Sequence, residues 1–108
     1  MSAVVLPTDM DRECIALCEA MNRLPGIETR NSCCGHNKYP YRIWFNARSL
    51  KALPRLLYWF DICHSGCPGW RVSVETDCAA CPAFFVVEGP VGHYEDAEKI
   101  AKLLEEEP

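Results

Sequence analysis

Residues 27–47 read IETRNSCCGHNKYPYRIWFNA, and this stretch decides the fold. Residues 27–34 and 41–47 alternate with a period of two, which is typical of β-strands that have one buried face. The residues between them, Gly35 to Pro40, include types that favour turns. The stretch therefore predicts an antiparallel hairpin.

Helical patterns flank this hairpin on both sides. Before it, apolar residues recur at helical spacing over residues 10–24, and Pro25 follows the run. After it, Ser49 is a candidate N-cap for a second helix that reaches about Cys63. Pro54 lies inside this second helix, where it either kinks the helix or marks its first turn.

A second hairpin and a further helix follow. Residues 70–77 and 83–88 are rich in aromatic and β-branched residues, and they flank the turn sequence CAACP. The apolar stripe from Ala97 to Leu104 then predicts a final helix. The chain thus consists of a leading helix and two hairpin-helix units.

This order, α-ββα-ββα, predicts an α+β fold in one domain over residues 1–108. Because the strands alternate, we expect one four-stranded antiparallel sheet with the helices packed on a single face. The residues expected beneath the helices are Ile43, Phe45, Val72 and Val74.

The cysteine content restricts the cellular environment. Eight cysteines in 108 residues suit either a secreted disulfide framework or an intracellular protein with thiol or metal chemistry. The N-terminal residues lack the basic start of a signal peptide, and the longest apolar run, residues 56–60, is too short to span a membrane. We therefore expect a cytoplasmic protein without a membrane partner, in which several cysteines are small buried residues.

Charge is unevenly distributed along the chain, whose net charge is −4. Residues 29–60 contain no Asp or Glu, and their basic residues are Arg30, Lys38, Arg42, Arg48, Lys51 and Arg55. Such a segment suits an anionic ligand such as a phosphate or RNA. The alternative is a solvated surface that acidic residues elsewhere neutralise.

The predicted topology brings cysteines and histidines to one end of the sheet. A second helix of about 20 Å returns the chain to the first loop, and a third strand of about 26 Å carries it away again. The residues expected together at the loop end are Cys33, Cys34, His36, Cys63, His64, Cys67 and His93. Cys78 and Cys81 are expected at the opposite end, which argues against a zinc ribbon built from both cysteine pairs.

Two kinds of chemistry suit this group of residues. Zinc prefers four thiolate or imidazole ligands in a tetrahedron, and the set Cys34, His36, Cys63 and Cys67 supplies them. Alternatively, Cys33 or Cys34 beside a histidine is a candidate thiolate nucleophile. Both compete with unmetallated thiols and imidazoles that have only packing and polar roles.

The strand YRIWFNA, residues 41–47, has a distinctive outer face. Its alternation buries Tyr41 and every second residue after it, and leaves Arg42, Trp44 and Asn46 on the other face. A tryptophan between a cation and an amide is typical of a surface on which nucleic-acid bases stack. The same composition suits the interface of a homodimer, and the two uses do not exclude each other.

Residues 26–45, GIETRNSCCGHNKYPYRIWF, resemble a sequence type in small uncharacterised bacterial and phage proteins, in which a strand ends in Ser-Cys-x-Gly-His. They more distantly resemble the Ser-Cys-Ser-Gly segment of the wybutosine-synthesis tRNA methyltransferase family. Ser32, Cys33 and Gly35 match that segment, and Cys34 replaces its second serine. The resemblance implies binding of tRNA or a nucleotide. Because members of that family are considerably longer, we do not expect a complete S-adenosylmethionine site.

The sequence therefore predicts a small ligand-binding domain for a nucleotide-like or other anionic ligand, with its site at the Ser-Cys-Cys-Gly-His loop. The rival prediction is an enzyme, either a methyltransferase-like modifier of tRNA or a cysteine-dependent transferase. A structural zinc protein is a further alternative. The residues expected to bind the ligand are Ser32, Cys33, Lys38, Arg42, Trp44 and His93.

Overall fold

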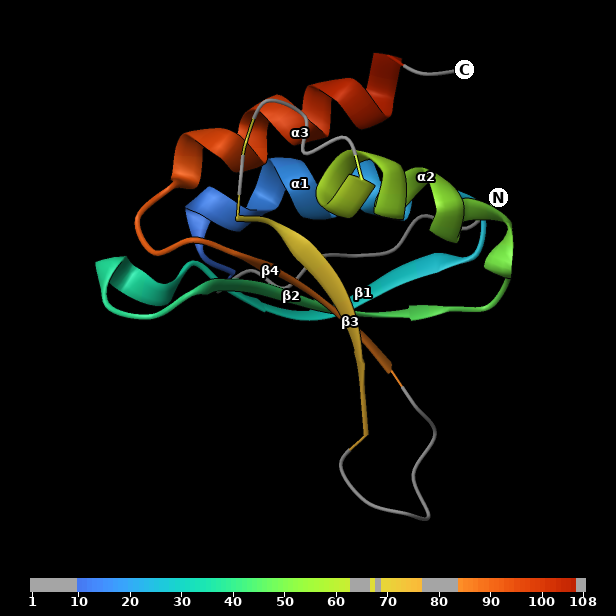
Figure 1. Cartoon of the computed structure of the whole chain (residues 1–108), viewed down its shortest axis with the longest axis horizontal. Coiled ribbons are helices and arrows are strands. Elements are labelled where there is room, and N and C mark those ends of the chain that lie inside the picture. Colours follow the sequence, from blue (N-terminus) through green and yellow to red (C-terminus); the bar gives the residue numbers. More distant parts are fainter. Residues whose placement is uncertain (1–9, 63–66, 68, 77–83, 107–108) are drawn as a thin grey trace.

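The computed structural model describes residues 10–62, 67, 69–76 and 84–106 (Figure 1). Its helices and strands are α1 (Arg12–Asn22), β1 (Ile27–Cys33), β2 (Tyr41–Ala47), α2 (Leu53–Leu57), β3 (Arg71–Glu75), β4 (Phe84–Gly89) and α3 (Tyr94–Glu106). Figure 1 shows the three helices on one side of the sheet. In the described ranges, no helix has the length and apolar character needed to cross a membrane.

The four strands form one antiparallel sheet in the order β1-β2-β4-β3. Both predicted hairpins are present, β1 with β2 and β3 with β4, and the predicted fold class is confirmed. The register of β1 shifts between Thr29 and Asn31, so Arg30 is an extra residue on this strand. Such a β-bulge changes the direction in which neighbouring side chains point.

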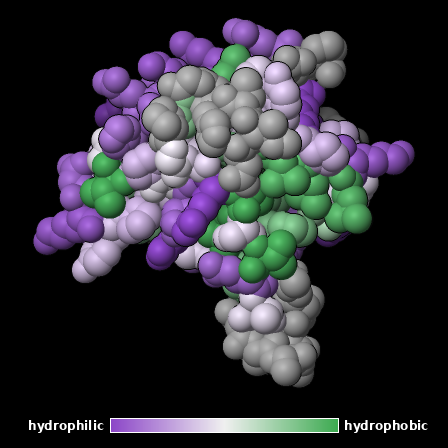
Figure 2. All heavy atoms as spheres, in the orientation of Figure 1, coloured by the Kyte–Doolittle hydropathy of each residue, from purple (hydrophilic) through white to green (hydrophobic). Residues whose placement is uncertain are grey.

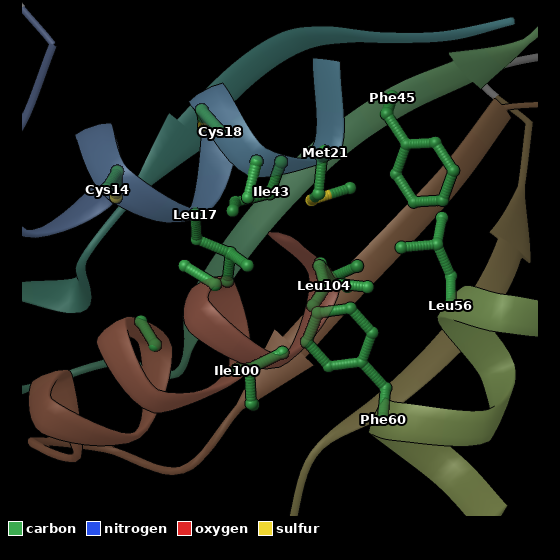
Figure 3. Close-up of a cluster of buried hydrophobic side chains, with 14 of the residues drawn as sticks. Cys14, Leu17, Cys18, Met21, Ile43, Phe45, Leu56, Phe60, Ile100 and Leu104 are labelled. Carbon is green, nitrogen blue, oxygen red and sulfur yellow. The ribbon is translucent and has the colours of Figure 1, made fainter. Parts of the chain in front are cut away.

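The hydrophobic core lies between the helices and one face of the sheet (Figure 3). Ile43 and Phe45 of β2 are fully buried, as predicted. The helical segments that cover them contribute Leu17 and Met21 from α1, Leu56 and Phe60 from α2 and the turn after it, and Ile100 and Leu104 from α3. The predicted apolar stripe of the last helix is thus part of the core.

The predicted helix over residues 49–63 is divided into three short pieces. A 3₁₀ turn at Leu50–Ala52 precedes α2, and a π-helical turn at Tyr58–Ile62 follows it. Ser49 caps the first piece, because its hydroxyl accepts a hydrogen bond from the Lys51 N–H at 3.2 Å. Pro54 lies in the first turn of α2, where a missing N–H costs no helical hydrogen bond. Of the two alternatives for Pro54, the first-turn position is correct.

The prediction that Val74 is buried is wrong. Val74 is 62% exposed, and Val72 is only half-buried at the margin of the core. Val74 pairs with Phe85, so it lies on the predicted face, but β3 is an edge strand whose end leaves the region beneath the helices (Figure 1). Figure 2 shows hydrophobic residues at the surface beside β3 and below α2. Val74 and Leu50 are among the large hydrophobic residues that are exposed. Alternation predicts the face of a side chain and not whether another element covers it.

Candidate functional site

The face of the sheet opposite the helices, called the open face below, carries side chains in rows that the strand register sets. Strand register places Arg42, Glu88 and Arg71 side by side in one row. The next row consists of Asn31, Trp44, Val86 and Ser73. None of the three described helices lies on this face (Figure 1). The sequence-based placement of Arg42 and Trp44 is therefore correct.

A pocket of about 340 Å³ opens on this face and is lined by Arg30, Asn31, Trp44 and Phe84. Phe84 is 8% exposed and Trp44 is half-buried, so their rings supply its apolar lining. The bulge in β1 allows consecutive residues, Arg30 and Asn31, to contribute to the same pocket. The Arg30 guanidinium carbon lies 6.0 Å from the centre of the Phe84 ring, which is within the range of a cation–π contact.

The charges on the open face are only partly compensated. Arg42 donates a 2.8 Å hydrogen bond to Glu88, and Arg71 donates one of 3.1 Å to the other carboxylate oxygen. The hydrogen bond from Arg42 lowers the pKa of Glu88, although burial opposes this shift. Two arginines thus share one carboxylate. Among the described residues, no carboxylate pairs with Arg30, which makes it the cation available to a ligand in the pocket.

The predicted basic segment is less basic than its sequence indicates. Arg42 pairs with Glu88, and Arg48 pairs with Glu28 of the neighbouring strand. Both partners come from segments outside the stretch that lacks acidic residues. Pairing across the sheet therefore concentrates the uncompensated charge at a few positions, with Arg30 at the pocket.

The Ser-Cys-Cys-Gly-His loop forms a second candidate site with the start of α1. The Cys34 N–H donates a 2.9 Å hydrogen bond to Asp11 Oδ2, and His36 Nε2 lies 3.9 Å from the same oxygen. The Gly35 N–H donates to Cys33 Sγ at 3.4 Å. As a result, the potential metal-ligating atoms of Asp11, Cys33 and His36 all lie within 4.8 Å of one another.

The loop has an unusual backbone that explains this proximity. Gly35, His36 and Asn37 have φ angles of 83°, 51° and 65°, three consecutive residues in the left-handed region. A side chain at Gly35 would lie 3.0 Å from the Pro40 carbonyl oxygen, and the Lys38 and Tyr39 N–H groups both donate to the Gly35 carbonyl. The chain therefore turns back on itself and directs His36 towards Asp11.

This arrangement differs from the predicted zinc set of Cys34, His36, Cys63 and Cys67. Cys34 is buried in the core, with its Sγ 3.6 Å from His36 Nδ1. Cys67 is also buried, and burial together with the charge of Asp96 raises the pKa of its thiol. Cys63 lies outside the described residues, as do His64, Cys78 and Cys81. In the described part of the chain, the only group of three ligating side chains at metal-binding distances is Asp11, Cys33 and His36.

The first residues of α3 approach the same end of the sheet, as predicted. A side chain at Gly92 would lie 3.1 Å from Asn37 Oδ1, so the loop before α3 contacts the Cys-His loop. His93 Nδ1 lies 3.3 Å from Asp96 Oδ2, and the Trp70 indole N–H donates to that oxygen at 3.2 Å. His93 is thus a neighbour of Asp96 rather than of the pocket. Lys38 is exposed on the Cys-His loop.

Ser32, which was predicted to bind the ligand, faces the core rather than the pocket. It pairs with Ile43 and faces the helices, where its hydroxyl lowers the pKa of the buried Cys14 and Cys18 thiols, although burial outweighs this effect. Figure 3 shows both cysteines on α1. Burial raises the pKa of Cys14 to about 11 and that of Cys18 to about 12. Burial likewise raises the pKa of Cys34, so these three cysteines are neutral thiols and poor nucleophiles at neutral pH.

Sequence reasoning missed Asp11, Arg30, Asn31 and Phe84 as site residues. Asp11 precedes a helix and is distant in sequence from the loop that it contacts, so no local pattern connects them. Arg30 and Asn31 reach one pocket through a bulge, which simple alternation does not predict. The lack of acidic residues over positions 29–60 was the one feature of the sequence that could have indicated Arg30 as an anion-binding residue.

The chain matches no family model, no curated protein and no solved structure. The resemblance of residues 32–36 to the Ser-Cys-x-Gly-His proteins and to the wybutosine-synthesis family therefore stays a prediction.

Proposed function

We propose that the open face binds a nucleotide-like ligand, with the base against Trp44 and the phosphate at Arg30. The observation that carries this proposal is the pocket lined by Arg30, Asn31, Trp44 and Phe84. It combines two aromatic rings, one amide and one arginine. These are the groups that recognise the face of a base, its polar edge and a phosphate.

The aromatic lining supplies the apolar part of binding. Stacking of one base on an aromatic side chain contributes about 1 to 3 kcal/mol, whatever the base. The Trp44 ring is half-buried, so it is held by its neighbours and still has an accessible surface. A pocket of about 340 Å³ falls at the lower end of the range for small-molecule sites. It suits a single base with its sugar.

Arg30 supplies the anion-binding part. Its guanidinium is positioned by Phe84 and has no carboxylate partner among the described residues, so a phosphate would not have to displace an ion pair. A guanidinium can donate two parallel hydrogen bonds to a phosphate. Arg42 and Arg71 share Glu88 in the adjacent row, and this trio adds one further net positive charge to the face.

Three alternatives to this proposal have to be considered. A cysteine-dependent enzyme needs a thiol with a lowered pKa, and burial raises the pKa of Cys34 and Cys67. A methyltransferase-like modifier of tRNA would need the same base-binding surface, so it is a specialised form of the present proposal. A homodimer formed through Trp44 is the competing use of the open face.

Calorimetric titration of the full chain with adenosine monophosphate, adenosine and inorganic phosphate tests the proposal. We expect the monophosphate to bind most tightly and Trp44→Ala to weaken it about 5- to 150-fold, the equivalent of 1 to 3 kcal/mol. Arg30→Gln should reduce the preference for the monophosphate over adenosine. The matched control is Arg48→Gln, which alters an exposed arginine already paired with Glu28.

Three outcomes would contradict the proposal. The first is the absence of binding by all three compounds. The second is an equal loss of affinity in Arg30→Gln and Arg48→Gln, which would indicate nonspecific charge attraction. The third is a dimer in light scattering that Trp44→Ala converts to a monomer while leaving affinity unchanged, which would make the open face a self-association surface.

A further inference from the structure

We propose that Asp11, Cys33 and His36 bind one zinc-type transition-metal ion, with a fourth coordination position open to solvent. This inference does not depend on nucleotide binding. It replaces the predicted ligand set, because it takes its thiolate from Cys33 rather than Cys34 and adds a carboxylate from the start of α1. The reasons are the distances, the outer hydrogen bonds and the backbone of the loop.

The three ligand atoms are already close to coordination distances. They lie within 4.8 Å of one another, and His36 Nε2 is 3.9 Å from Asp11 Oδ2. Around a tetrahedral zinc with bonds of 2.0 to 2.3 Å, ligand atoms are separated by roughly 3.3 to 3.7 Å. Small rotations of the side chains would therefore close the site, and no movement of β1 or α1 is needed.

Each of the three proposed ligands contacts a neighbouring group that orients its side chain and leaves an atom free to coordinate the metal. The Cys34 N–H holds the Asp11 carboxylate, and the Gly35 N–H holds Cys33 Sγ. On the other side of the imidazole, His36 Nδ1 faces Cys34 Sγ at 3.6 Å, which directs Nε2 towards Asp11. Metal-ligating histidines usually have their second nitrogen held by an outer partner, and ligating carboxylates are themselves hydrogen-bonded.

The backbone gives a separate indication. A non-glycine residue with positive φ is uncommon, and His36 and Asn37 both have it. Strained backbone of this kind persists where the surrounding structure determines it, and it concentrates at functional sites. Here the strain is what places the imidazole beside Asp11 and Cys33.

The types of the three ligands indicate which metal ion fits the site, and their exposure indicates whether solvent reaches it. One thiolate, one imidazole and one carboxylate suit zinc or cobalt(II), whereas magnesium and calcium prefer oxygen ligands only. The side chain of His36 is 66% exposed and that of Asp11 is 25% exposed, so solvent reaches the site. Three protein ligands with an open position are typical of zinc sites that bind a water or a substrate group, and closed structural sites have four.

The test uses the full chain, stripped with chelator, kept reduced with a phosphine and titrated with cobalt(II) alone and with zinc alone. Cobalt bound to Cys33 should show thiolate-to-metal charge-transfer absorption, and native mass spectrometry should show one zinc per chain. Cys33→Ser should abolish the charge-transfer absorption of this site. His36→Asn should weaken zinc more than about 100-fold, since even outer-shell changes cost 10- to 100-fold.

The variants are chosen so that folding does not obscure the result. His36 is largely exposed, and asparagine tolerates the left-handed backbone that this position requires. The matched control is His93→Asn, at another exposed histidine beside an aspartate, and it should leave the zinc affinity unchanged. Circular dichroism of each variant verifies the fold.

Three results would overturn the inference. The first is wild-type protein that retains no zinc at equimolar concentration. The second is a charge-transfer band and a zinc stoichiometry that persist in both Cys33→Ser and His36→Asn, which would place the metal on other cysteines. The third is an equal loss of affinity in His36→Asn and His93→Asn.

Discussion

Gly89→Ala, at the end of β4, should destabilise the fold more than any ordinary glycine-to-alanine change in a strand. A Cβ at this position would lie 2.6 Å from Cε2 and Cζ2 of Trp70. Nonbonded carbon atoms prefer separations of about 3.5 to 4.0 Å, so the indole or the strand would have to move by about 1 Å. The clash is therefore with the body of a rigid ring and not with a flexible side-chain end.

Trp70 has little freedom to move. It is 2% exposed, and its ring centre lies 5.1 Å from that of Tyr41 and 5.8 Å from that of Phe60. Its indole N–H also donates to Asp96 at 3.2 Å. Overpacking a dense core costs about 1 to 3 kcal/mol, and loss of the hydrogen bond adds about 1 kcal/mol. We therefore expect a loss of about 2 to 4 kcal/mol in the free energy of unfolding.

Urea denaturation followed by circular dichroism measures this loss, and a double-mutant cycle identifies its cause. Phenylalanine lacks the second ring of the indole, so in a Trp70→Phe background the cost of Gly89→Ala should fall by at least about 1 kcal/mol. A loss below about 0.5 kcal/mol for Gly89→Ala alone would refute the packing described for Trp70. An equal cost in both backgrounds would show that the clash is not with the indole.

Three further predictions concern the core, the charges and the pocket. Leu104→Ala should cost about 2 to 5 kcal/mol in chemical denaturation, because Leu104 is 3% exposed within the core. Arg42 lowers the pKa of Glu88 from its ordinary 4.5, so the carboxylate stabilises the fold above that pH, and this contribution is lost as pH falls through the lowered folded value. Glu88→Gln should therefore reduce stability at pH 7 by about 1 kcal/mol and flatten the stability profile below pH 4.5; an unchanged profile would contradict the pairing. Glu75→Gln should tighten nucleotide binding, most clearly at low salt, because Glu75 is an exposed carboxylate paired in register with Phe84; weaker binding in titration calorimetry would place the phosphate elsewhere.

Much of the fold follows from local patterns in the sequence. Alternation over residues 27–34 and 41–47 predicted the first hairpin and the burial of Ile43 and Phe45. Alternation is sufficient for this because it separates the residues of a strand into two faces, of which the apolar one is buried. Val74 was predicted wrongly for the same reason. Val74 lies on the predicted face of the sheet, but whether it is buried depends on how far the helices extend over that face. The pattern of residues in a strand carries no information about this.

The sequence indicated the positions of the candidate sites more completely than the residues that form them. The Cys-His loop and Trp44 were found from residue type and period. The pocket partners Arg30 and Asn31 depend on a bulge, and Asp11 depends on the packing of α1 against the end of β1. Adjacent cysteines add a further difficulty, since Cys33 and Cys34 are chemically identical and only the structure shows that Cys34 is buried.

Binding at the open face is tested most directly by nuclear magnetic resonance of the labelled full chain titrated with adenosine monophosphate. The chain has three tryptophans, so their indole N–H signals give an internal comparison. We predict a saturable shift of the Trp44 indole signal and of the Asn31 amides, while the indole of Trp70, buried and bonded to Asp96, stays unchanged. An unshifted Trp44 signal at saturating nucleotide, or shifts confined to other residues, would contradict the proposed function.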